Sequence, residues 1–443
     1  MHWFPRLFPR VVLALLWWRT AVVAPAQNPF VRVENGRFTV DGQPYFFIGT
    51  NYWYGSLLAD TRKSRRRLRK ELKFLKKQGV DNLRVLVGAE GVSDYPFRVS
   101  PALQPQPGQY DEKRLRGLDY LLDQMARRGM YAVLYLTNNW EWSGGLAQYR
   151  AWEEGSDIPF PRLPGHSWGD FMQYVSIFHS CTPCKEAVVR HIRFILNRTN
   201  SVNGRPYTQD PTIMAWQVAN EPRPMRADNA AAFADWLRET TALIKSIDPN
   251  HLVTLGNEGT AGCEGSMDLY EQIHADPNVD YMTIHIWAKN WGWFPDTAIA
   301  QNLPGIIEKC AAYVDQHDSV ARRLAKPLVL EEFGLPRDGH SFPPTATVLE
   351  RDAYYSSIFK KIEQNRNGGG MLAGCNFWAF GGHPKYLAKG LFWKPGDAPS
   401  GDPPQEEQGL NSVFQTDKST WAQVRTFSLL LQNPAAASFT LKR

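Results

Sequence analysis

The strongest constraint on the fold is an alternation of short apolar runs with longer amphipathic segments along nearly the whole chain. Apolar runs of roughly four to eight residues, bounded by turn signals, are typical of buried parallel strands. We expect eight such strands, at residues 46–49, 82–87, 131–136, 213–216, 252–256, 281–286, 328–334 and 371–378. Helices are expected at residues 60–78, 112–128, 185–197, 227–247, 303–324, 349–364 and 422–431. Strands that alternate with helices predict one parallel α/β domain.

Eight strand–helix units over roughly 400 residues favour a (β/α)8 TIM barrel, with an open doubly wound sheet as the alternative. Two turn pairs, Asn35-Gly36 and Asp41-Gly42, predict a short N-terminal β-hairpin before the first barrel strand. Long loops are expected on the C-terminal face, and residues 141–180 read as irregular. The first strand is not followed by a glycine-rich fingerprint, so a dinucleotide cofactor is not supported.

The N-terminus has the pattern of a secretory signal peptide. Two arginines precede the apolar run at residues 11–18, and Ala24-Pro25-Ala26 offers small residues for cleavage. We therefore expect residues 1–26 to be removed, leaving a single catalytic domain at residues 27–443 that is secreted or periplasmic. The apolar run is too short to span a bilayer, so no membrane contact is expected after removal of the signal.

Charge and cysteine usage exclude some classes of protein. Loss of residues 1–26 removes three arginines and lowers the formal charge from +6 to +3, which does not suggest nucleic-acid binding. Ten Lys or Arg between Arg62 and Lys77 predict the solvated face of a helix. The Cys181–Cys184 spacing favours a local disulfide at a helix start over a redox site. We expect a monomer.

Polar side chains stand at the ends of most expected strands, where barrel enzymes build their active sites. They are Arg84, Asn138, Asn220, Glu221, Asn257, Glu258, His285, Glu331, Glu332 and Trp378. Glu221 with one of Glu331 and Glu332 forms a pair of carboxylates, and strand alternation should turn only one of those two toward the barrel axis. Carboxylates about 5–5.5 Å apart support retaining glycoside hydrolysis, and about 6.5–9.5 Å supports inversion.

Aromatic residues are abundant, with 16 Trp in the chain. Several follow expected strand ends and serve either as stacking platforms for sugars or as loop packing: Trp53, Trp140, Trp142, Trp168, Trp291 and Trp293. If these rings stack on sugars, Asn138, Asn257 and Glu258 supply polar contacts to the sugar hydroxyls.

The chain contains no motif for a metal site or for a serine nucleophile. The ten histidines form no HxH or HExxH pattern, and the cysteines lack zinc spacing. A GxSxG elbow is absent as well. The sequence predicts neither a metal nor a cofactor.

Five segments resemble glycoside hydrolase family 5 of clan A, in its endo-β-1,4-mannanase branch. They are YTQDPTIM, AWQVANEPR, TIHIWAKNW, VLEEFG and GCNFWAFGG, and the resemblance runs in order across about residues 29–432. The Asn-Glu-Pro and Glu-Phe-Gly motifs are shared across the clan and imply the reaction type. Their flanks imply a mannan substrate.

The resemblance implies a role for each matching residue. Glu221 matches the general acid/base, and Asn220 the residue that holds the sugar 2-hydroxyl. Glu332, directly before Phe333-Gly334, matches the nucleophile, and three further matches support the site: Arg84 as the hydrogen-bond partner of the nucleophile, His285 as the strand-6 histidine and Trp378 as the floor under the sugar. The acid role requires a raised pKa at Glu221.

One position departs from the family pattern. Many relatives carry tyrosine two residues after the strand-6 histidine, where its hydroxyl orients the nucleophile, and this chain has Trp287. An indole still donates one N–H, so Trp287 is a candidate for the same task.

The sequence therefore predicts a retaining endo-β-1,4-mannanase that acts on mannan, glucomannan or galactomannan. A β-1,4-glucanase and an exo-β-mannosidase on the same scaffold remain alternatives. A non-catalytic carbohydrate-binding barrel is the alternative from another class, and it is disfavoured because both carboxylates and Arg84 are present.

Overall fold

The computed structural model describes residues 1–2, 29–92, 95–296, 298–384 and 388–432. The expected signal peptide lies almost wholly outside these residues. Within the described part of the chain, no helix has both the length and the apolar character needed to cross a membrane.

The core of the molecule is an eight-stranded parallel sheet in the order β8-β7-β6-β5-β4-β11-β10-β9. Its strands are β4 (Phe47–Asn51), β5 (Asn82–Leu86), β6 (Tyr131–Tyr135), β7 (Ile213–Gln217), β8 (Leu252–Thr254), β9 (Met282–Ile286), β10 (Leu328–Phe333) and β11 (Leu372–Phe377). Backbone hydrogen bonds from Asp280 to Val253 and from His285 to Glu258 join β9 to β8, the two ends of that order. The sheet thus forms a nearly closed barrel, which confirms the predicted fold class.

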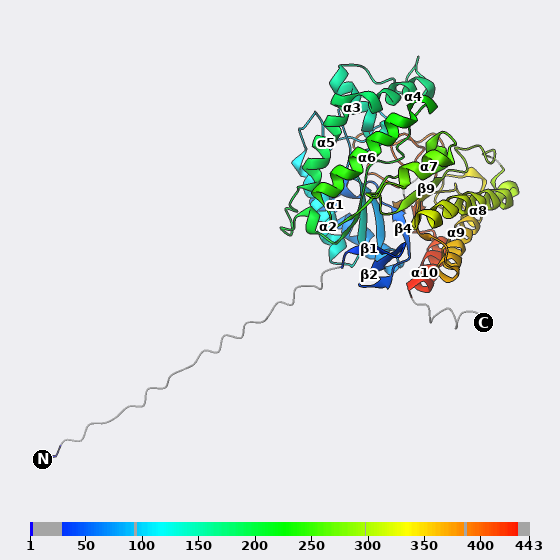
Figure 1. Cartoon of the computed structure of the whole chain (residues 1–443). Helices are drawn as coiled ribbons and strands as arrows, with labels where there is room; N and C mark the ends of the chain where they lie inside the picture. The colour runs from blue at the N-terminus through cyan, green and yellow to red at the C-terminus, as the bar shows by residue number, and fades with distance from the viewer. Residues whose placement is uncertain (3–28, 93–94, 297, 385–387, 433–443) are drawn as a thin grey trace, which may run out of the picture.

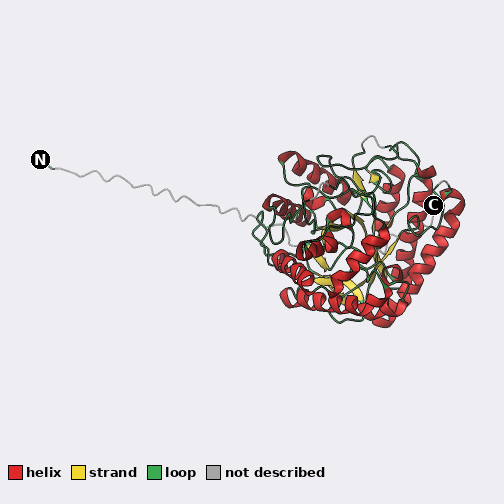
Figure 2. Cartoon of the chain, turned by 90° about the horizontal axis from the view of Figure 1, so that it is seen from above, coloured by secondary structure: helices red, strands yellow, loops and turns green. Residues whose placement is uncertain are grey.

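Helices surround the barrel, as the view from above shows (Figure 2). They are α1 (Arg62–Lys77), α2 (Glu112–Ala126), α5 (Thr182–Leu196), α6 (Ala230–Ile247), α7 (Met267–His274), α8 (Ile299–Leu324), α9 (Leu349–Gly368) and α10 (Lys418–Gln432). Helix α1 illustrates why these segments are helical. A capping box between Thr61 and Ser64 begins it, and Leu68, Leu72 and Leu75 turn into the core. Most of its basic residues face solvent, as predicted.

The prediction that residues 141–180 are irregular is wrong. This segment contains α3 (Gly145–Glu154) and α4 (Trp168–Ser176). The start of α3 gives no capping signal, because it begins at Gly144 and Gly145, both of which have positive φ. Helix α4 does begin with a capping box, between Ser167 and Asp170. Helix α7 was not predicted either.

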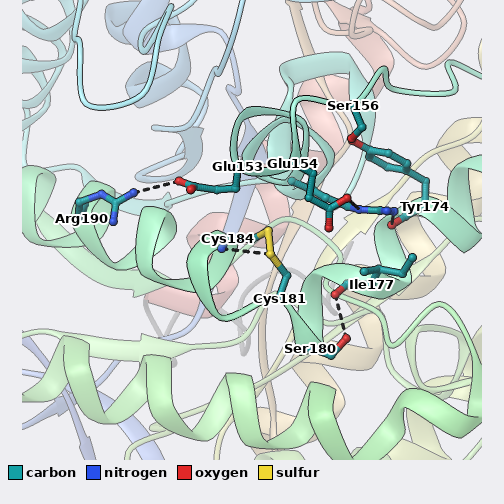
Figure 3. Close-up of a disulfide and its surroundings, with 10 residues drawn as sticks. Glu153, Glu154, Ser156, Tyr174, Ile177, Ser180, Cys181, Cys184 and Arg190 are labelled. Atoms are coloured by element: carbon teal, nitrogen blue, oxygen red, sulfur yellow. Dashed lines mark hydrogen bonds and ion pairs between the residues drawn. A yellow bond between two sulfur atoms is a disulfide. The ribbon is translucent and has the colours of Figure 1, made fainter.

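The expected disulfide is present between Cys181 and Cys184, at the start of α5. Figure 3 shows it beneath the Glu153–Arg190 ion pair, which links α3 to α5. The ion pair therefore links α3 to the helical layer, whereas the disulfide closes only a short local loop at the start of α5.

The N-terminal hairpin closes the bottom of the barrel. Strands β1 (Val31–Glu34), β2 (Arg37–Val40) and β3 (Gln43–Pro44) form a small antiparallel sheet. Buried Phe38 packs against Phe47 and Tyr281 from the barrel. Figure 1 shows this hairpin at the end of the molecule opposite α3 and α4. The C-terminal end, where loops follow the barrel strands, remains open to build a site.

A last pair of strands lies in the long connection from β11 to α10. Strands β12 (Phe380–Gly382) and β13 (Val413–Phe414) pair in parallel. Between them a loop crosses over the mouth of the barrel, since residues from Phe392 to Leu410 line the cavity described below.

Candidate active site

A cavity of about 700 Å³ lies at the C-terminal end of the barrel. Of the residues proposed from sequence, its lining includes Trp140, Asn220, Glu221, Trp287, Glu332 and Trp378. Arg84 and His285 are fully buried directly beneath it. The structure thus brings residues from β5, β6, β7, β9, β10 and β11 to one place, as expected when parallel strands end at the same rim.

The two carboxylates of the predicted pair lie close together. Glu221, Glu332 and His285 each place one side-chain atom within 4.8 Å of the other two. The indole N–H of Trp287 bridges the carboxylates, at 3.3 Å from Glu221 Oε1 and 3.2 Å from Glu332 Oε2. Trp287 thus donates a hydrogen bond to Glu332, which is the contact that the sequence analysis expected it to make in place of tyrosine.

Arg84 holds Glu332 from below. Its Nη1 donates to Glu332 Oε1, and its Nη2 donates to Asn220 Oδ1 at 2.7 Å. Two further acceptors, Gln217 and Asn51, take the remaining hydrogen bonds at 2.8 and 3.1 Å. A guanidinium that donates four hydrogen bonds is fixed in position, so it fixes the carboxylate that it contacts.

Glu331 belongs to the same buried network, outside the cavity. It is fully buried, lies 3.6 Å from Arg84 and accepts hydrogen bonds from Gln217 and Tyr281. Strand alternation predicted opposite directions for Glu331 and Glu332, and this is wrong because both contact Arg84. The register of β10 against β9 shifts between Leu330 and Glu332, and such an irregularity re-aims side chains. Only Glu332 lines the cavity.

His285 connects the two carboxylates electrostatically. Its Nδ1 lies 2.8 Å from Glu221 Oε1 and 3.5 Å from Glu332 Oε2. Burial alone would lower the pKa of His285, but the charge of Glu332 and the hydrogen bond to Glu221 raise it to about 10. The imidazole is therefore protonated on both nitrogens at neutral pH, and its Nδ1–H faces Glu221.

The pKa values of the two carboxyls differ from the sequence expectation. Burial and the charge of Glu221 raise the pKa of Glu332 to about 7, against the effects of His285 and Arg84. Burial would also raise the pKa of Glu221, but the hydrogen bond and charge of His285 lower it to about 2. The proton expected on Glu221 is therefore held by its neighbour His285. Groups this close titrate together.

Backbone geometry helps to aim Glu221. Its φ of 50° is unusual for a residue other than glycine, and a hydrogen bond from its N–H to Gly256 O at 3.0 Å holds it. Trp140 donates its indole N–H to the second carboxylate oxygen, Oε2. Hydrogen bonds therefore hold both carboxylate oxygens of Glu221. Trp140 contacts Oε2, and His285 and Trp287 contact Oε1.

Aromatic rings line several parts of the cavity. Trp378 packs edge-on to Trp287, with ring centroids 5.9 Å apart, and its indole N–H has no hydrogen-bond partner among the described residues. Trp142, Trp168 and Trp291 also line the cavity. These rings provide flat apolar surfaces, and the carboxylates, Asn220 and Arg223 provide polar contacts, which is the composition that a sugar requires.

Four predicted sugar contacts do not line the cavity. Trp53 is buried and donates its indole N–H to Gly401 O. Asn138 and Asn257 are also buried, and each is engaged within the protein: Asn138 accepts from Asn220, and Asn257 donates to backbone carbonyls. Trp293 packs on Trp291. Trp53, Asn138 and Asn257 therefore support the loops of the site, since their polar atoms already have protein partners.

Several lining residues were not predicted. Arg223 forms an ion pair with Glu258, and its guanidinium lies over the Trp140 ring. Glu141, Arg162, Gln405 and Glu406 come from loops that lack periodic patterns. Glu141, which directly follows Trp140, and Arg223, which lies two residues after Glu221, stand near enough to predicted site residues to have been proposed.

Two clusters of the described residues have metal-like spacing. Glu154 lies near Cys181 and Cys184, but the disulfide removes both thiolates as ligands. Glu221, His285 and Glu332 form the other cluster. There the guanidinium of Arg84 and a protonated His285 already supply positive charge, so the donor set does not suit a metal ion.

The paired carboxylates, the buried arginine and the aromatic cavity define the site of a glycoside hydrolase on a (β/α)8 barrel. The model of the GH family 5 β-mannosidase-like proteins matches residues 28–434. The chain belongs to this family, and it is a glycoside hydrolase, as the sequence resemblance implied.

Relatives with curated names are similar to most of the chain. A putative mannan endo-1,4-beta-mannosidase 9 of Oryza sativa subsp. japonica is 30% identical over 373 residues, which cover 80% of this chain and 82% of the relative. Mannan endo-1,4-beta-mannosidase 7 of Arabidopsis thaliana is 29% identical over 385 residues, covering 84% and 83%.

Solved structures agree with the fold. A glycoside hydrolase family 5 mannosidase from Rhizomucor miehei is 34% identical, with a TM-score of 0.83, and the match covers 92% of this chain and 98% of that one. An endo-beta-1,4-mannanase from Thermotoga petrophila, 23% identical with a TM-score of 0.67 and a match covering 89% and 78%, shares the fold.

Proposed function

We propose that this enzyme hydrolyses β-1,4-mannosidic bonds with retention of configuration at the anomeric carbon. The observation that carries this proposal is the approach of Glu221 and Glu332 oxygens to within 4.8 Å. Inverting enzymes need about 6.5–9.5 Å between their carboxyls to admit a water molecule. A shorter separation suits direct attack by one carboxylate on the sugar.

In the first step, Glu332 attacks the anomeric carbon and forms an ester, while the bond to the leaving oxygen breaks. Glu221 delivers a proton to that oxygen. The proton comes from His285, whose Nδ1 lies 2.8 Å from Glu221. The charge of Glu332 is the largest influence that raises the pKa of His285. Its loss in the ester therefore releases the proton when the leaving oxygen needs it.

In the second step, water attacks the anomeric carbon and the ester bond to Glu332 breaks. Glu221 and His285 accept the proton that water loses, so the site returns to its initial state. Arg84 remains bonded to Glu332 Oε1 and favours its charged form as a leaving group. Two inversions in sequence give net retention.

Mannan is the proposed substrate class because the curated relatives at about 30% identity carry the name mannan endo-1,4-beta-mannosidase. Their names support the endo mode that the sequence predicts. The solved structure at 34% identity is named a mannosidase, and this supports a β-mannosidase as the second candidate. We further propose export through residues 1–26 and action as a single-domain monomer.

The test is hydrolysis by the purified enzyme of mannan, glucomannan, galactomannan and β-1,4-glucan, with proton NMR of the first products. We expect cleavage of mannans and initial appearance of the β-anomer. An initial α-anomer would overturn retention, and faster cleavage of the glucan would overturn the mannan assignment. Exclusive release of mannose would exclude the endo mode.

A further inference from the structure

A third carboxylate, that of Glu331, lies beneath the cavity, and the proposed reaction gives it no task. Glu331 is fully buried on β10, one residue before Glu332, and it does not line the cavity. A sugar in the cavity therefore does not reach it. A buried carboxylate is costly unless it is paired and hydrogen-bonded. Any effect of Glu331 on the reaction must pass through the groups that it contacts.

Within the described residues, the polar contacts of the Glu331 carboxylate are with donors and cations. Its Oε2 accepts a hydrogen bond from Gln217 Nε2 at 2.5 Å and lies 3.6 Å from Arg84 Nε. Its Oε1 accepts from the Tyr281 hydroxyl at 3.3 Å. An ionised carboxylate only accepts hydrogen bonds, whereas a protonated one would turn its own hydrogen toward one of these donors. The surroundings thus suit the ionised form.

The amide of Gln217 is held in one orientation. Its Oε1 accepts from Arg84 Nε at 2.8 Å, and a guanidinium offers no acceptor to an amide N–H. The oxygen of the amide must therefore face Arg84, so the Nε2 hydrogens face Glu331. The donor that Glu331 receives is thus fixed by its neighbours.

His285 lies between Glu331 and the proposed acid/base. Its Nδ1 is 2.8 Å from Glu221 Oε1, and its Nε2 is 3.9 Å from Glu331 Oε2, which is too far for a hydrogen bond but within the range of an ion pair. This Nε2 is buried and has no hydrogen-bond partner among the described residues. A lone pair at Nε2 would face a carboxylate oxygen, whereas an N–H places positive charge toward it. Glu331 therefore favours a hydrogen on Nε2.

Other charged or titratable groups surround His285 and Glu331. They are Arg84 on β5, Glu221 after β7, Glu258 after β8, Tyr281 before β9, Glu332 on β10 and Tyr270 on α7. Burial lowers the pKa of His285, and the charge of Glu332 raises it most, followed by the contacts with Glu221 and Glu331. Three acids therefore act on one imidazole.

Glu331 differs from the other two acids in what happens to it during the reaction. Glu332 loses its charge when the ester forms, and Glu221 passes on a proton. Glu331 makes and breaks no bond, so its charge beside Nε2 stays the same through both steps. It can therefore keep one hydrogen of His285 in place while the other hydrogen moves.

We propose that Glu331 is a positioning residue that keeps the Nε2 hydrogen of His285, so that the Nδ1 hydrogen is the one that moves through Glu221 to the leaving oxygen. In the second step, the proton that water loses returns through Glu221 to Nδ1, which is free to accept it. The inference rests on the proposed function, in which His285 supplies the proton. Glu331 would then set the alkaline limit of activity.

Nitrogen NMR of the enzyme labelled with ¹⁵N-histidine tests this without substrate. The signals of His285 are those missing in His285→Asn. In the wild type we expect both ring nitrogens to be protonated at about pH 7, with Nδ1 losing its hydrogen first as the pH rises. In Glu331→Gln the same loss should occur about one to three pH units lower. A neutral His285 at about pH 7 in the wild type, or a neutral form protonated on Nδ1, would overturn the inference even if the variant fails to fold.

The pH profile of activity separates this role from simple support of Arg84. Glu331→Gln keeps the size of the side chain and one acceptor oxygen but removes the charge. We expect the alkaline limb of kcat/KM for mannohexaose to move about one to three units to lower pH. Tyr281→Phe, the matched control, removes a donor to Glu331 and leaves its charge, so the limb should stay in place.

The outcomes are distinguishable. Lower activity of Glu331→Gln at every pH, with the limb unmoved, would mean that Glu331 only supports Arg84 and would overturn the inference. Failure of the wild type to cleave any β-mannoside would overturn the proposed function, and the NMR titration would still decide whether Glu331 holds the Nε2 hydrogen.

Discussion

Two groups of buried carboxylates share one cavity, and they differ in whether they have hydrogen-bond partners within the protein. At the floor, Glu332 and Glu221 are bonded to Arg84, His285 and Trp287. At the side wall of the cavity, the carboxylate of Glu141 has no such partner among the described residues. Buried charges need compensation, and the partners at the floor hold its carboxylates in position. Burial raises the pKa of Glu141 at the wall to about 7, and it raises the pKa of Glu332 at the floor to about the same value.

The comparison also explains how a proton can be available while the proposed acid is ionised. The hydrogen bond and charge of His285 lower the pKa of Glu221 to about 2, against the effect of burial. At the wall burial dominates, and the pKa of Glu141 rises to about 7. Partners lower the pKa of Glu221, whereas desolvation raises the pKa of both Glu332 and Glu141.

The largest effect should follow from removing the charge at the floor. Glu332→Gln preserves the shape of the side chain but cannot form the ester, so we expect kcat on mannan to fall by about 10⁴-fold or more. Calorimetry should still detect mannooligosaccharide binding. Glu308→Gln, an exposed change of the same kind, serves as control. Activity near that of wild type would show that Glu332 is not the nucleophile.

A smaller effect should follow from removing the bridge between the floor carboxylates. Trp287→Phe keeps a ring against Trp378 but loses the N–H that contacts Glu221 and Glu332. We expect kcat to fall about 10- to 100-fold with little change in KM, because hydrogen bonds to charged groups contribute about 1.5–3 kcal/mol. Trp287→Tyr should recover part of the loss. A wild-type kcat in Trp287→Phe would contradict this role.

The smallest effect concerns stability at the wall. The pKa of Glu406 is raised to about 8 in the folded protein, so the folded state binds its proton more tightly than the unfolded state does. Stability from this group is therefore complete at acidic pH and declines as the pH rises to about 8. Glu406→Gln removes the decline.

Thermal unfolding at two pH values measures this difference. We expect the Tm of Glu406→Gln to match wild type near pH 4.5 and to exceed it by roughly 2 °C at pH 9. The exposed Glu308→Gln should show no such dependence on pH. An equal Tm difference at both pH values would mean that Glu406 ionises without cost.

Most catalytic residues at the floor of the cavity could be predicted from the sequence, because the strands of a barrel place their final residues at the same rim. Glu221, His285 and Glu332 stand at or near the end of recognisable apolar runs, Arg84 lies within one, and the repeated alternation of strands and helices identified the barrel itself. The choice between Glu331 and Glu332 needed the family resemblance, since strand alternation fails at the irregularity in β10.

The residues at the side wall of the cavity could not be predicted in this way. Glu406 lies 74 residues beyond Glu332 in a loop without periodicity, and nothing in its local sequence indicates that it lines the same cavity as Glu141. In the same way, Trp53 and Asn257 resembled sugar contacts, but their polar atoms are satisfied inside the protein. Periodic burial is a local property, so the sequence alone determined the barrel and the positions of its strand-end residues. Loop packing depends on contacts between distant segments, so only the tertiary structure decided which of these residues line the cavity and what closes it.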